Sequence, residues 1–369
     1  MMRRVYIGQY SNGQDCGILS IGVDEATGEI VRLNHCGGYP NTLWLLPSHD
    51  GSRLYAARDG GITVFDTTKP CLRPIADYSL VRTQPCHMSL SSDGKRLYFA
   101  EYTDAICGII ELDSGVILTA TLEGSGPDPA RQTAAHAHCA IETPDGRHLC
   151  VADLGSDSIW LFDSKSLVLE CKMKTMPSGA GPRHIAFHPN GKFAYIVFEL
   201  ANIIAAYRYI DGKLEHIQTL PLLPENFSGH SQAAALKISG CGKMLFATNR
   251  GHDSAVAFGI DPDSGKMAAA AHSPLGGNWP RDLTLLPGGK IAVGCLEREG
   301  EVRTYSFDAG ANLFTPLPFS VKMHRPVVAA TDPSRNAKDT KGESCEYESF
   351  FNAEAQRRRE KFKWAVEPI

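Results

Sequence analysis

Residues 90–100 read Leu-Ser-Ser-Asp-Gly-Lys-Arg-Leu-Tyr-Phe-Ala, and closely similar segments occur at 46–57 and 187–197. Each segment places a tight turn between two short apolar runs, which is the pattern of a β-hairpin. Six such turns occur along the chain, at Asp50-Gly51, Asp93-Gly94, Asp145-Gly146, Asn190-Gly191, Cys241-Gly242 and Gly288-Gly289. They recur at intervals of 43 to 52 residues, the repeat length of a four-stranded propeller blade.

The segments between the hairpins complete each repeat. A third apolar run follows the hairpin, as at 159–162 and 205–209, and a further turn leads to a fourth. The N-terminus supplies only a second, third and fourth strand, and residues 325–330 resemble the missing first one. We therefore expect an all-β fold, a seven-bladed β-propeller with four-stranded antiparallel blades. The N-terminal strands and a C-terminal strand close its ring, which leaves no free sheet edge.

Composition and charge fit one propeller domain over residues 1–330. The chain has 369 residues, of which 35 are Gly and 22 are Pro, as many short strands require. Residues 331–369 are polar, and we expect a flexible extension in which 348–366 is compatible with a short basic helix. The net charge of −4 argues against a nucleic-acid partner. Without an apolar signal segment or membrane-spanning run, we expect a cytoplasmic protein with no membrane partner.

Eleven cysteines are scattered over the blades. None falls in a Cys-x-x-Cys pair, and Cys150 and Cys295 lie inside apolar strands. In a cytosolic chain this distribution favours reduced core thiols over disulfides or a metal centre.

Polar residues cluster where the strands of a propeller meet at one mouth of the channel. The expected starts of the first strands carry Pro85-Cys86-His87, His136-Ala137-His138-Cys139, Gly181-Pro182-Arg183-His184, Pro280-Arg281-Asp282 and His324-Arg325-Pro326. The ends of the second strands carry Glu101, Asp153, Glu199, Asn249-Arg250 and Glu297-Arg298. A ring of imidazoles, guanidiniums and carboxylates suits a small anionic ligand.

Three segments resemble a known family. They are Gly179-Ala-Gly-Pro-Arg-His-Ile-Ala-Phe-His-Pro-Asn190, Glu199-Leu-Ala-Asn202 and Pro224-Glu-Asn-Phe-Ser228. Together they are similar to the bacterial seven-bladed propeller lactonases, a family with propeller-type 6-phosphogluconolactonases and the fungal carboxy-cis,cis-muconate lactonizing enzyme. The similarity extends over roughly residues 4–330.

The resemblance implies a catalytic group of one His, two Arg and one Glu. These positions fall on His138, Arg183, Glu199 and Arg250. Two departures stand out: Phe198 occupies a place where relatives often have Asn, and the blade at 280–308 looks one residue short, which puts the register of Glu297 in question.

Lactone hydrolysis needs an activated water, a stabilised oxyanion and a proton for the departing ring oxygen. Glu199 or His138 could be the base, with the other as the acid, and the two arginines could hold the oxyanion and the substrate's anionic group. Candidate substrate-binding residues are His87, Asp153, His184 and Arg281. Structural roles, such as capping loop amides, are the alternative for each of them.

A divalent metal is a further alternative, because His136 and His138 lie on one side of an extended segment. The many arginines at this mouth would repel a cation, so we expect no metal and no other cofactor.

The expected function is hydrolysis of a sugar lactone, with 6-phosphoglucono-δ-lactone of the pentose phosphate pathway as the first substrate. A muconolactone-type cycloisomerase or lactonase of aromatic catabolism is one alternative. A non-catalytic propeller that binds a protein is another, because a fold alone does not define a function. The sequence leaves the choice between phosphate and carboxylate, and the oligomeric state, open.

Overall fold

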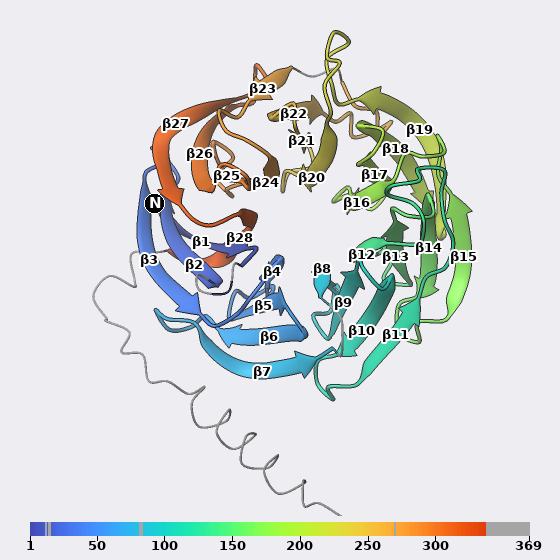
Figure 1. Cartoon of the computed structure of the whole chain (residues 1–369), viewed down its shortest axis with the longest axis horizontal. Coiled ribbons are helices and arrows are strands. Elements are labelled where there is room, and N and C mark those ends of the chain that lie inside the picture. The colour runs from blue at the N-terminus through green and yellow to red at the C-terminus, as the bar shows by residue number, and fades with distance from the viewer. Residues whose placement is uncertain (12, 14–15, 81–83, 269–270, 337–369) are drawn as a thin grey trace, which may run out of the picture.

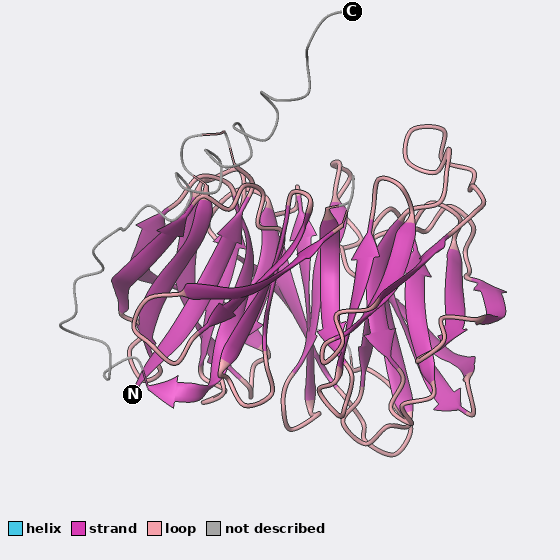
Figure 2. Cartoon of the chain, turned by 90° about the horizontal axis from the view of Figure 1, so that it is seen from below, coloured by secondary structure: helices cyan, strands magenta, loops and turns pink. Residues whose placement is uncertain are grey.

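A computed structural model describes residues 1–336 except residues 12, 14–15, 81–83 and 269–270. The described chain forms seven four-stranded antiparallel sheets arranged around a central axis (Figure 1). This confirms the expected seven-bladed β-propeller. The side view shows the strands running between two loop-covered faces (Figure 2).

Six blades are formed by consecutive strands. Blade 1 contains β4 (Trp44–Pro47), β5 (Arg53–Arg58), β6 (Gly61–Asp66) and β7 (Arg73–Ser79). Blade 2 contains β8 (Pro85–Leu90), β9 (Arg96–Glu101), β10 (Ile106–Glu111) and β11 (Ile117–Thr121). Blade 3 contains β12 (Ala137–Glu142), β13 (His148–Asp153), β14 (Ser158–Asp163) and β15 (Leu169–Lys174).

The next three blades follow the same order. Blade 4 contains β16 (Pro182–Phe187), β17 (Phe193–Phe198), β18 (Ile203–Ile210) and β19 (Lys213–Pro221). Blade 5 contains β20 (Gln232–Ile238), β21 (Met244–Arg250), β22 (Ser254–Gly259) and β23 (His272–Pro274). Blade 6 contains β24 (Pro280–Leu285), β25 (Ile291–Leu296), β26 (Glu301–Asp308) and β27 (Leu313–Lys322).

The closing blade joins the two ends of the propeller. Its sheet order is β28 (Pro326–Asn336), β1 (Met2–Gln9), β2 (Gly17–Asp24) and β3 (Ile30–Gly37). The pairing of β28 with β1 begins at Gln9↔Pro326 and reaches Arg3↔Asn336. The strand therefore continues past the expected domain boundary at residue 330, so residues 331–336 belong to the blade and not to a flexible extension. Residues 337–369, including the expected basic helix, lie outside the described residues.

The hairpin turns form for a local reason that the sequence shows. In blade 2, Ser91 Oγ donates to Asp93 Oδ1 at 2.6 Å, and the amide of Arg96 donates to Ser91 Oγ at 2.9 Å. Gly94 adopts a φ of +69°, which is a left-handed conformation that glycine reaches without strain. Its amide donates to the Ser91 carbonyl at 2.9 Å, closing the turn.

The first strand of every blade lies at the centre of the ring (Figure 1). Each of these seven strands contacts the next, from β4 through β8, β12, β16, β20, β24 and β28 back to β4. They all run in the same sense, so their starts meet at one face, which we call the mouth. The second strands end at the same face, which is why residues from different blades converge there.

The core is made of layers between neighbouring blades. One cluster joins Tyr98 and Ala100 of blade 2 to Leu149, Val151 and Trp160 of blade 3. Fully burying a side chain such as Leu or Val contributes about 1.5–3 kcal/mol each. Because every layer is shared by two blades, the ring holds the mouth residues of neighbouring blades in a fixed relation.

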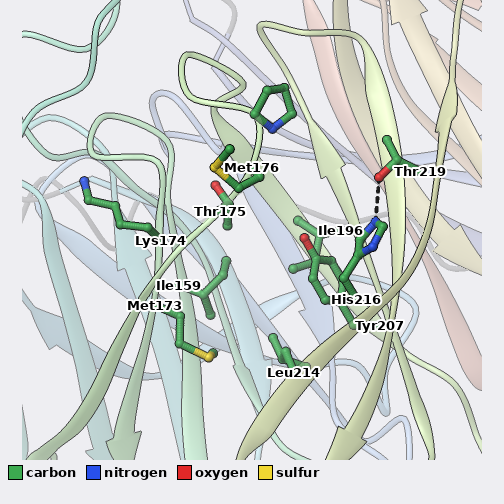
Figure 3. Close-up of a pocket in the computed structure, with 11 residues that line it drawn as sticks. Ile159, Met173, Lys174, Thr175, Met176, Ile196, Tyr207, Leu214, His216 and Thr219 are labelled. Carbon is green, nitrogen blue, oxygen red and sulfur yellow. Dashed lines mark hydrogen bonds between the residues drawn. The ribbon is translucent and has the colours of Figure 1, made fainter.

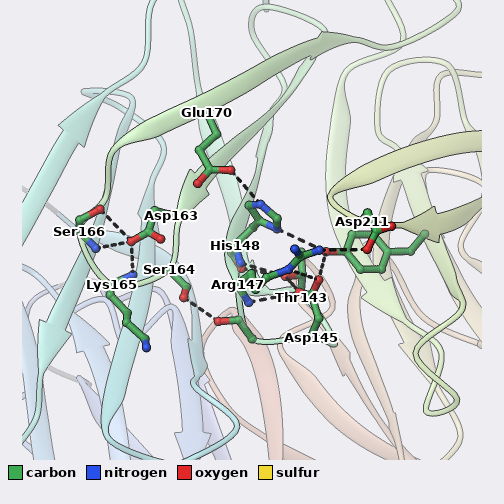
Figure 4. A network of polar contacts seen from close by, with 12 residues as sticks. Thr143, Asp145, Arg147, His148, Asp163, Ser164, Lys165, Ser166, Glu170 and Asp211 are labelled. Carbon is green, nitrogen blue, oxygen red and sulfur yellow. Dashed lines mark hydrogen bonds and ion pairs between the residues drawn. The ribbon is translucent and has the colours of Figure 1, made fainter.

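A polar network joins blades 3 and 4 (Figure 4). Asp145 lies in the turn between the first and second strands of blade 3, and Asp211 lies in the turn between the third and fourth strands of blade 4, so the network is at the face opposite the mouth. Arg147 donates to Asp145 Oδ2 at 2.9 Å and to Asp211 Oδ1 at 3.2 Å. His148 Nε2 lies 2.9 Å from Glu170 Oε2. These contacts join hairpin turns of adjacent blades and lie far from the mouth.

Two findings concern membrane-spanning helices and the cysteines. Among the described residues no helix is long and apolar enough to span a membrane. Nine described cysteines are free thiols, most of them buried. Cys71 is disulfide-bonded, which departs from the expectation that every cysteine is reduced.

Candidate active site

A bulge at the second residue of the first strand recurs in four blades. In blade 4, Pro182 pairs with Phe198 and His184 with Val197, so Arg183 is the extra residue. The same shift occurs in blades 2, 3 and 6 at Cys86, His138 and Arg281. A bulge re-aims the side chain of its extra residue. Three polar side chains predicted for the site, His138, Arg183 and Arg281, are therefore presented at the mouth by one backbone device.

Glu199 is the centre of the first charged cluster. It follows β17 directly and is only 2% exposed. Its Oε2 accepts from Arg183 Nε at 2.9 Å and lies 2.8 Å from Arg250 Nη2. Its Oε1 accepts from Arg131 Nη2 at 2.7 Å. Three of the four predicted catalytic residues thus meet directly, and Arg131 joins them.

The arginines are fixed by further bonds to the backbone. Arg183 Nη1 donates to the Ala234 carbonyl at 2.6 Å, and Arg250 Nη2 donates to the Ala233 carbonyl at 3.0 Å. Nη2 of Arg183 and Nη1 of Arg250 and of Arg131 make none of these bonds. These three nitrogens are also absent from the buried polar atoms that lack a partner in the described part of the chain, so they are accessible. They are therefore open donors for an anionic ligand or an oxyanion.

Charge and burial set the protonation of this cluster. Burial opposes ionisation of Glu199, but Arg250 and Arg183 outweigh it and hold its pKa well below the usual range. Burial, followed by the charge of Arg250, lowers the pKa of Arg183 to about 9. At neutral pH the carboxylate and the arginines are therefore all ionised. One negative charge among three positive ones leaves a net positive site.

His138 stands beside this cluster as a neutral imidazole. Burial, followed by the charge of Arg183, holds its pKa well below 6.5. Its ring meets those of Tyr102 and His184 edge to face, with centroids 5.6 and 5.4 Å away. Its Nδ1 is buried without a hydrogen-bond partner among the described residues. Buried polar atoms are rarely left unpaired, so this nitrogen is a natural place for a water or substrate proton.

Sequence reasoning missed two residues that build the site. Arg131 lies in the irregular segment between β11 and β12, where no strand pattern pointed to it. Asp157, only 3% exposed, accepts from the amide of Gly181 at 2.8 Å and from Gln132 Nε2 at 2.7 Å. One carboxylate thus ties the segment that carries Arg131 to the start of the strand that carries Arg183.

Gly181 makes this connection possible. It adopts a φ of +66°, and a Cβ at this position would lie 2.8 Å from Leu200 Cγ. Both facts require glycine immediately before Pro182.

His87 and His184 lie beneath the mouth, where they pack and support other residues. The His87 ring packs against Trp44 at a tilt of 40° with centroids 4.3 Å apart, and its Nδ1 accepts from the Ala140 amide at 3.3 Å. Burial lowers its pKa to about 3. His184 lies among the rings of Trp44, His87 and His138, and Arg183 Nη1 is 3.0 Å from its Nε2. This arrangement favours supporting roles over direct substrate binding.

Asp153 has the position of a loop cap. Its Oδ1 accepts from the amides of His136, Gly155 and Ser156 at 2.8, 3.1 and 3.1 Å. Its Oδ2 accepts from Ser156 Oγ and from Trp160 Nε1. Fully buried and occupied by five bonds, this carboxylate shapes the loop and has no open face for a substrate.

The register of blade 6 corrects one expectation. Pro280 pairs with Leu296 in blade 6 as Pro182 pairs with Phe198 in blade 4. The blade is therefore not a residue short: its turn uses Gly288-Gly289 in place of Asp-Gly or Asn-Gly. Arg281 contacts Glu297 with Nη1 3.4 Å from Oε2, which forms a second cluster at the mouth.

A separate apolar hollow of about 620 Å³ lies between the outer parts of blades 3 and 4 (Figure 3). Ile159, Met173, Met176 and Leu214 are among its lining residues. It is lined by no carboxylate and no arginine, and by none of the residues of the Glu199 cluster. Its lining includes His216 and Lys174 but no arginine pair or carboxylate that would hold an oxyanion or an anionic group, so the mouth remains the candidate active site.

The metal alternative finds no ligand set among the residues that the structure describes. His136 Nδ1 lies 2.8 Å from the Tyr102 carbonyl, and its ring stacks on Tyr102. No group of three or more His, Cys, Asp or Glu side chains suited to a metal ion occurs in the described ranges. Metal independence remains a prediction.

The fold and the site define a class: a seven-bladed propeller whose mouth holds a buried glutamate clamped by arginines beside a neutral histidine. Residues 4–331 match the model of the family described as lactonase, 7-bladed β-propeller. The chain belongs to this lactonase family.

Individual relatives agree with this assignment. The chain is 29% identical over 336 residues to the 6-phosphogluconolactonase of Bacillus subtilis, covering 87% of this chain and 96% of that protein. It is 31% identical to an uncharacterized protein of Lactococcus lactis, covering 77% and 86%. A solved structure of the periplasmic gluconolactonase of Pseudomonas aeruginosa superposes with a TM-score of 0.83 at 25% identity, covering 91% of this chain and all of that one.

Proposed function

We propose that this protein hydrolyses 6-phosphoglucono-δ-lactone to 6-phosphogluconate. The observation that carries the proposal is the Glu199 cluster: three arginines with open donors surround one buried carboxylate, next to a neutral imidazole. This combination offers a base for water and a positive site for an oxyanion. The name of the Bacillus subtilis relative supports the choice of substrate.

His138 is the base in this proposal. Both oxygens of Glu199 are already held by guanidiniums, whereas Nδ1 of the neutral His138 has no hydrogen-bond partner among the described residues and is free to accept a proton from water. His138 takes the proton as water attacks the lactone carbonyl carbon. The same proton then passes to the ring oxygen when the C–O bond breaks, which leaves a carboxylic acid and a free hydroxyl.

The arginines stabilise the charge that develops in this step. The carbonyl oxygen becomes an oxyanion, and the open Nη atoms of Arg183 and Arg250 are the nearest fixed donors to the cluster. Glu199 acts as a positioning residue. It pairs with both guanidiniums and offsets the repulsion between their positive charges, which would otherwise move them apart. Preorganised donors of this kind contribute about 2.7–4 kcal/mol each to transition-state stabilisation.

The proposal also includes a metabolic pathway and a cellular compartment. The reaction belongs to the pentose phosphate pathway and would occur in the cytoplasm, although the Pseudomonas relative is described as periplasmic. It needs no cofactor and no macromolecular partner.

The test measures hydrolysis of freshly generated 6-phosphoglucono-δ-lactone. The release of acid reports the rate, which is compared with the rate of spontaneous hydrolysis. Wild-type protein is expected to accelerate the reaction equally with and without a chelator. A muconolactone is assayed in parallel. Acceleration of the muconolactone alone would replace the proposed substrate, and no acceleration of either would refute it.

A further inference from the structure

A second cluster at the mouth repeats the geometry of the first. Glu297 follows β25 as Glu199 follows β17, and it is 3% exposed. Arg281 precedes Glu297 by 16 residues, the same separation as between Arg183 and Glu199. Arg325 Nη2 donates to Glu297 Oε1 at 2.6 Å from the other side. A buried carboxylate again positions two guanidiniums.

This second cluster is more open than the first. The side chain of Arg325 is 49% exposed, compared with 5% for Arg250. The ring of Tyr10 supports both guanidiniums, with Cζ of Arg281 at 5.2 Å and Cζ of Arg325 at 4.5 Å from its centroid. Such cation–π contacts fix guanidinium planes without using their donors.

The backbone also holds Arg325 in a costly conformation. Its φ is +40°, in the left-handed region, and its carbonyl accepts from the Tyr10 amide at 3.1 Å. Strain of this kind at a non-glycine residue persists only where the surroundings impose it, and it is concentrated at functional sites.

The two clusters belong to one mouth. The Trp279 ring lies 5.7 Å from Arg250 Cζ on the first cluster's side and 3.3 Å from Arg298 Cζ on the second's. The Trp279 carbonyl accepts from the Glu297 amide at 3.0 Å. Arg281 is also among the charges that lower the pKa of Arg250. A single small molecule can therefore contact both clusters.

We infer that the second cluster, Arg281 and Arg325 around Glu297 with Arg298 on the adjacent Trp279 ring, binds the phosphate of a phosphorylated lactone while the Glu199 cluster acts on its carbonyl. Arg281 and Arg325 pair with Glu297, and Arg298, the next residue along the chain, adds a third guanidinium on the Trp279 ring, so the surplus is about two positive charges. A phosphate monoester carries about −1.5 to −2 at pH 7, whereas a carboxylate would neutralise only half of the surplus. This inference rests on the proposed function and makes its substrate class specific.

The experiment compares 6-phosphoglucono-δ-lactone with unphosphorylated glucono-δ-lactone. The variant is Arg325→Gln, which removes an exposed guanidinium without emptying the core. The matched control is Arg147→Gln: that side chain is 56% exposed and also pairs with carboxylates, but it lies at the opposite face. For Arg325→Gln the ratio of kcat/KM between the two lactones should fall about tenfold to hundredfold, as expected for lost charge-assisted hydrogen bonds. Arg147→Gln should keep the wild-type ratio.

Inorganic phosphate provides a second readout that needs no turnover. It should raise the melting temperature of wild type and of Arg147→Gln, and raise that of Arg325→Gln less. An unchanged ratio of kcat/KM in Arg325→Gln would overturn the inference while leaving lactone hydrolysis intact. If wild type hydrolyses neither lactone, the proposed function fails, and the phosphate response alone decides: an equal response in wild type and Arg325→Gln overturns the phosphate site.

Discussion

Replacing Glu199 by Gln tests how much the buried carboxylate contributes. The substitution keeps the shape and removes one charge from contact with Arg183, Arg250 and Arg131. Two of these guanidiniums are almost fully buried, so they would be left as uncompensated charges. Removing one partner of a buried ion pair costs about 3–5 kcal/mol. We therefore expect the free energy of unfolding at pH 7 to fall by about that amount.

Turnover should fall as well. Without Glu199, the guanidiniums of Arg183 and Arg250 repel one another and no longer hold their open donors in place. The loss of one preorganised oxyanion donor lowers kcat by about 10²–10³, and we expect Glu199→Gln to fall in this range. The assay is steady-state hydrolysis of 6-phosphoglucono-δ-lactone, combined with urea unfolding of the same samples.

The stability effect has a defined pH dependence. The pKa of Glu199 is depressed in the folded state, so its contribution is present above the ordinary glutamate pKa and is lost as pH falls through the depressed folded value. The difference between wild type and variant should therefore shrink in strong acid.

Glu301→Gln is the matched control for Glu199→Gln. Glu301 is 4% exposed and lies on the third strand of blade 6, where it pairs with Arg303 of the same strand and with Lys322 of the fourth strand. The control variant should lose stability and keep turnover. Near wild-type turnover in Glu199→Gln would refute the reasoning about the cluster.

Three further predictions concern other residues of the mouth. Arg183→Lys should lower kcat/KM about a hundredfold, because an ammonium cannot reach Glu199 and the Ala234 carbonyl together with a planar fork; near-normal kinetics would contradict this role. Arg131→Gln should lower kcat/KM about tenfold and change unfolding in urea by less than about 1 kcal/mol, because its side chain is 30% exposed; an unchanged rate would place Arg131 outside the site. Unfolding free energy should fall by about 2 kcal/mol between pH 6.5 and pH 5 through His87 alone, because its pKa of about 3 means that the unfolded chain binds a proton that the folded chain excludes; a His87→Gln variant with the wild-type pH slope would disprove this.

The blade repeat could be predicted from the sequence because hairpin turns have a strong local signature. Asp93-Gly94 and its counterparts need a left-handed glycine, and their spacing counts the blades. The end of the last strand could not be predicted, because residues 331–336 look polar and become a strand only by pairing with β1. The blade with Gly288-Gly289 looked short for the same reason: the register comes from pairing across the strands and not from the turn alone.

The candidate site divides in the same way. Arg183, Glu199 and Arg250 lie on strands or directly after them, so the repeat placed them at one mouth. Arg131 reaches Glu199 from an irregular segment, and only the folded chain shows that contact. Asp153 looked like a substrate-binding residue in the sequence, but loop amides occupy its Oδ1, and the Ser156 hydroxyl and the Trp160 indole occupy its Oδ2. The sequence can show that a polar residue lies at a strand end and therefore at the mouth. Whether its side chain faces the ligand depends on the residues that surround it in the folded chain.

The pH dependence of kcat/KM tests the central claim most directly, namely that a buried neutral His138 activates water beside the arginine-clamped Glu199. The profile should be measured for wild type and His138→Gln, with the spontaneous hydrolysis of the lactone subtracted. The low pKa of His138 predicts that wild-type kcat/KM stays level as pH falls from 8 through 6.5 and declines only in more acidic solution, and that His138→Gln loses most of the activity at every pH. An acidic decline centred at the ordinary histidine pKa near 6.5, or wild-type activity in His138→Gln, would contradict it.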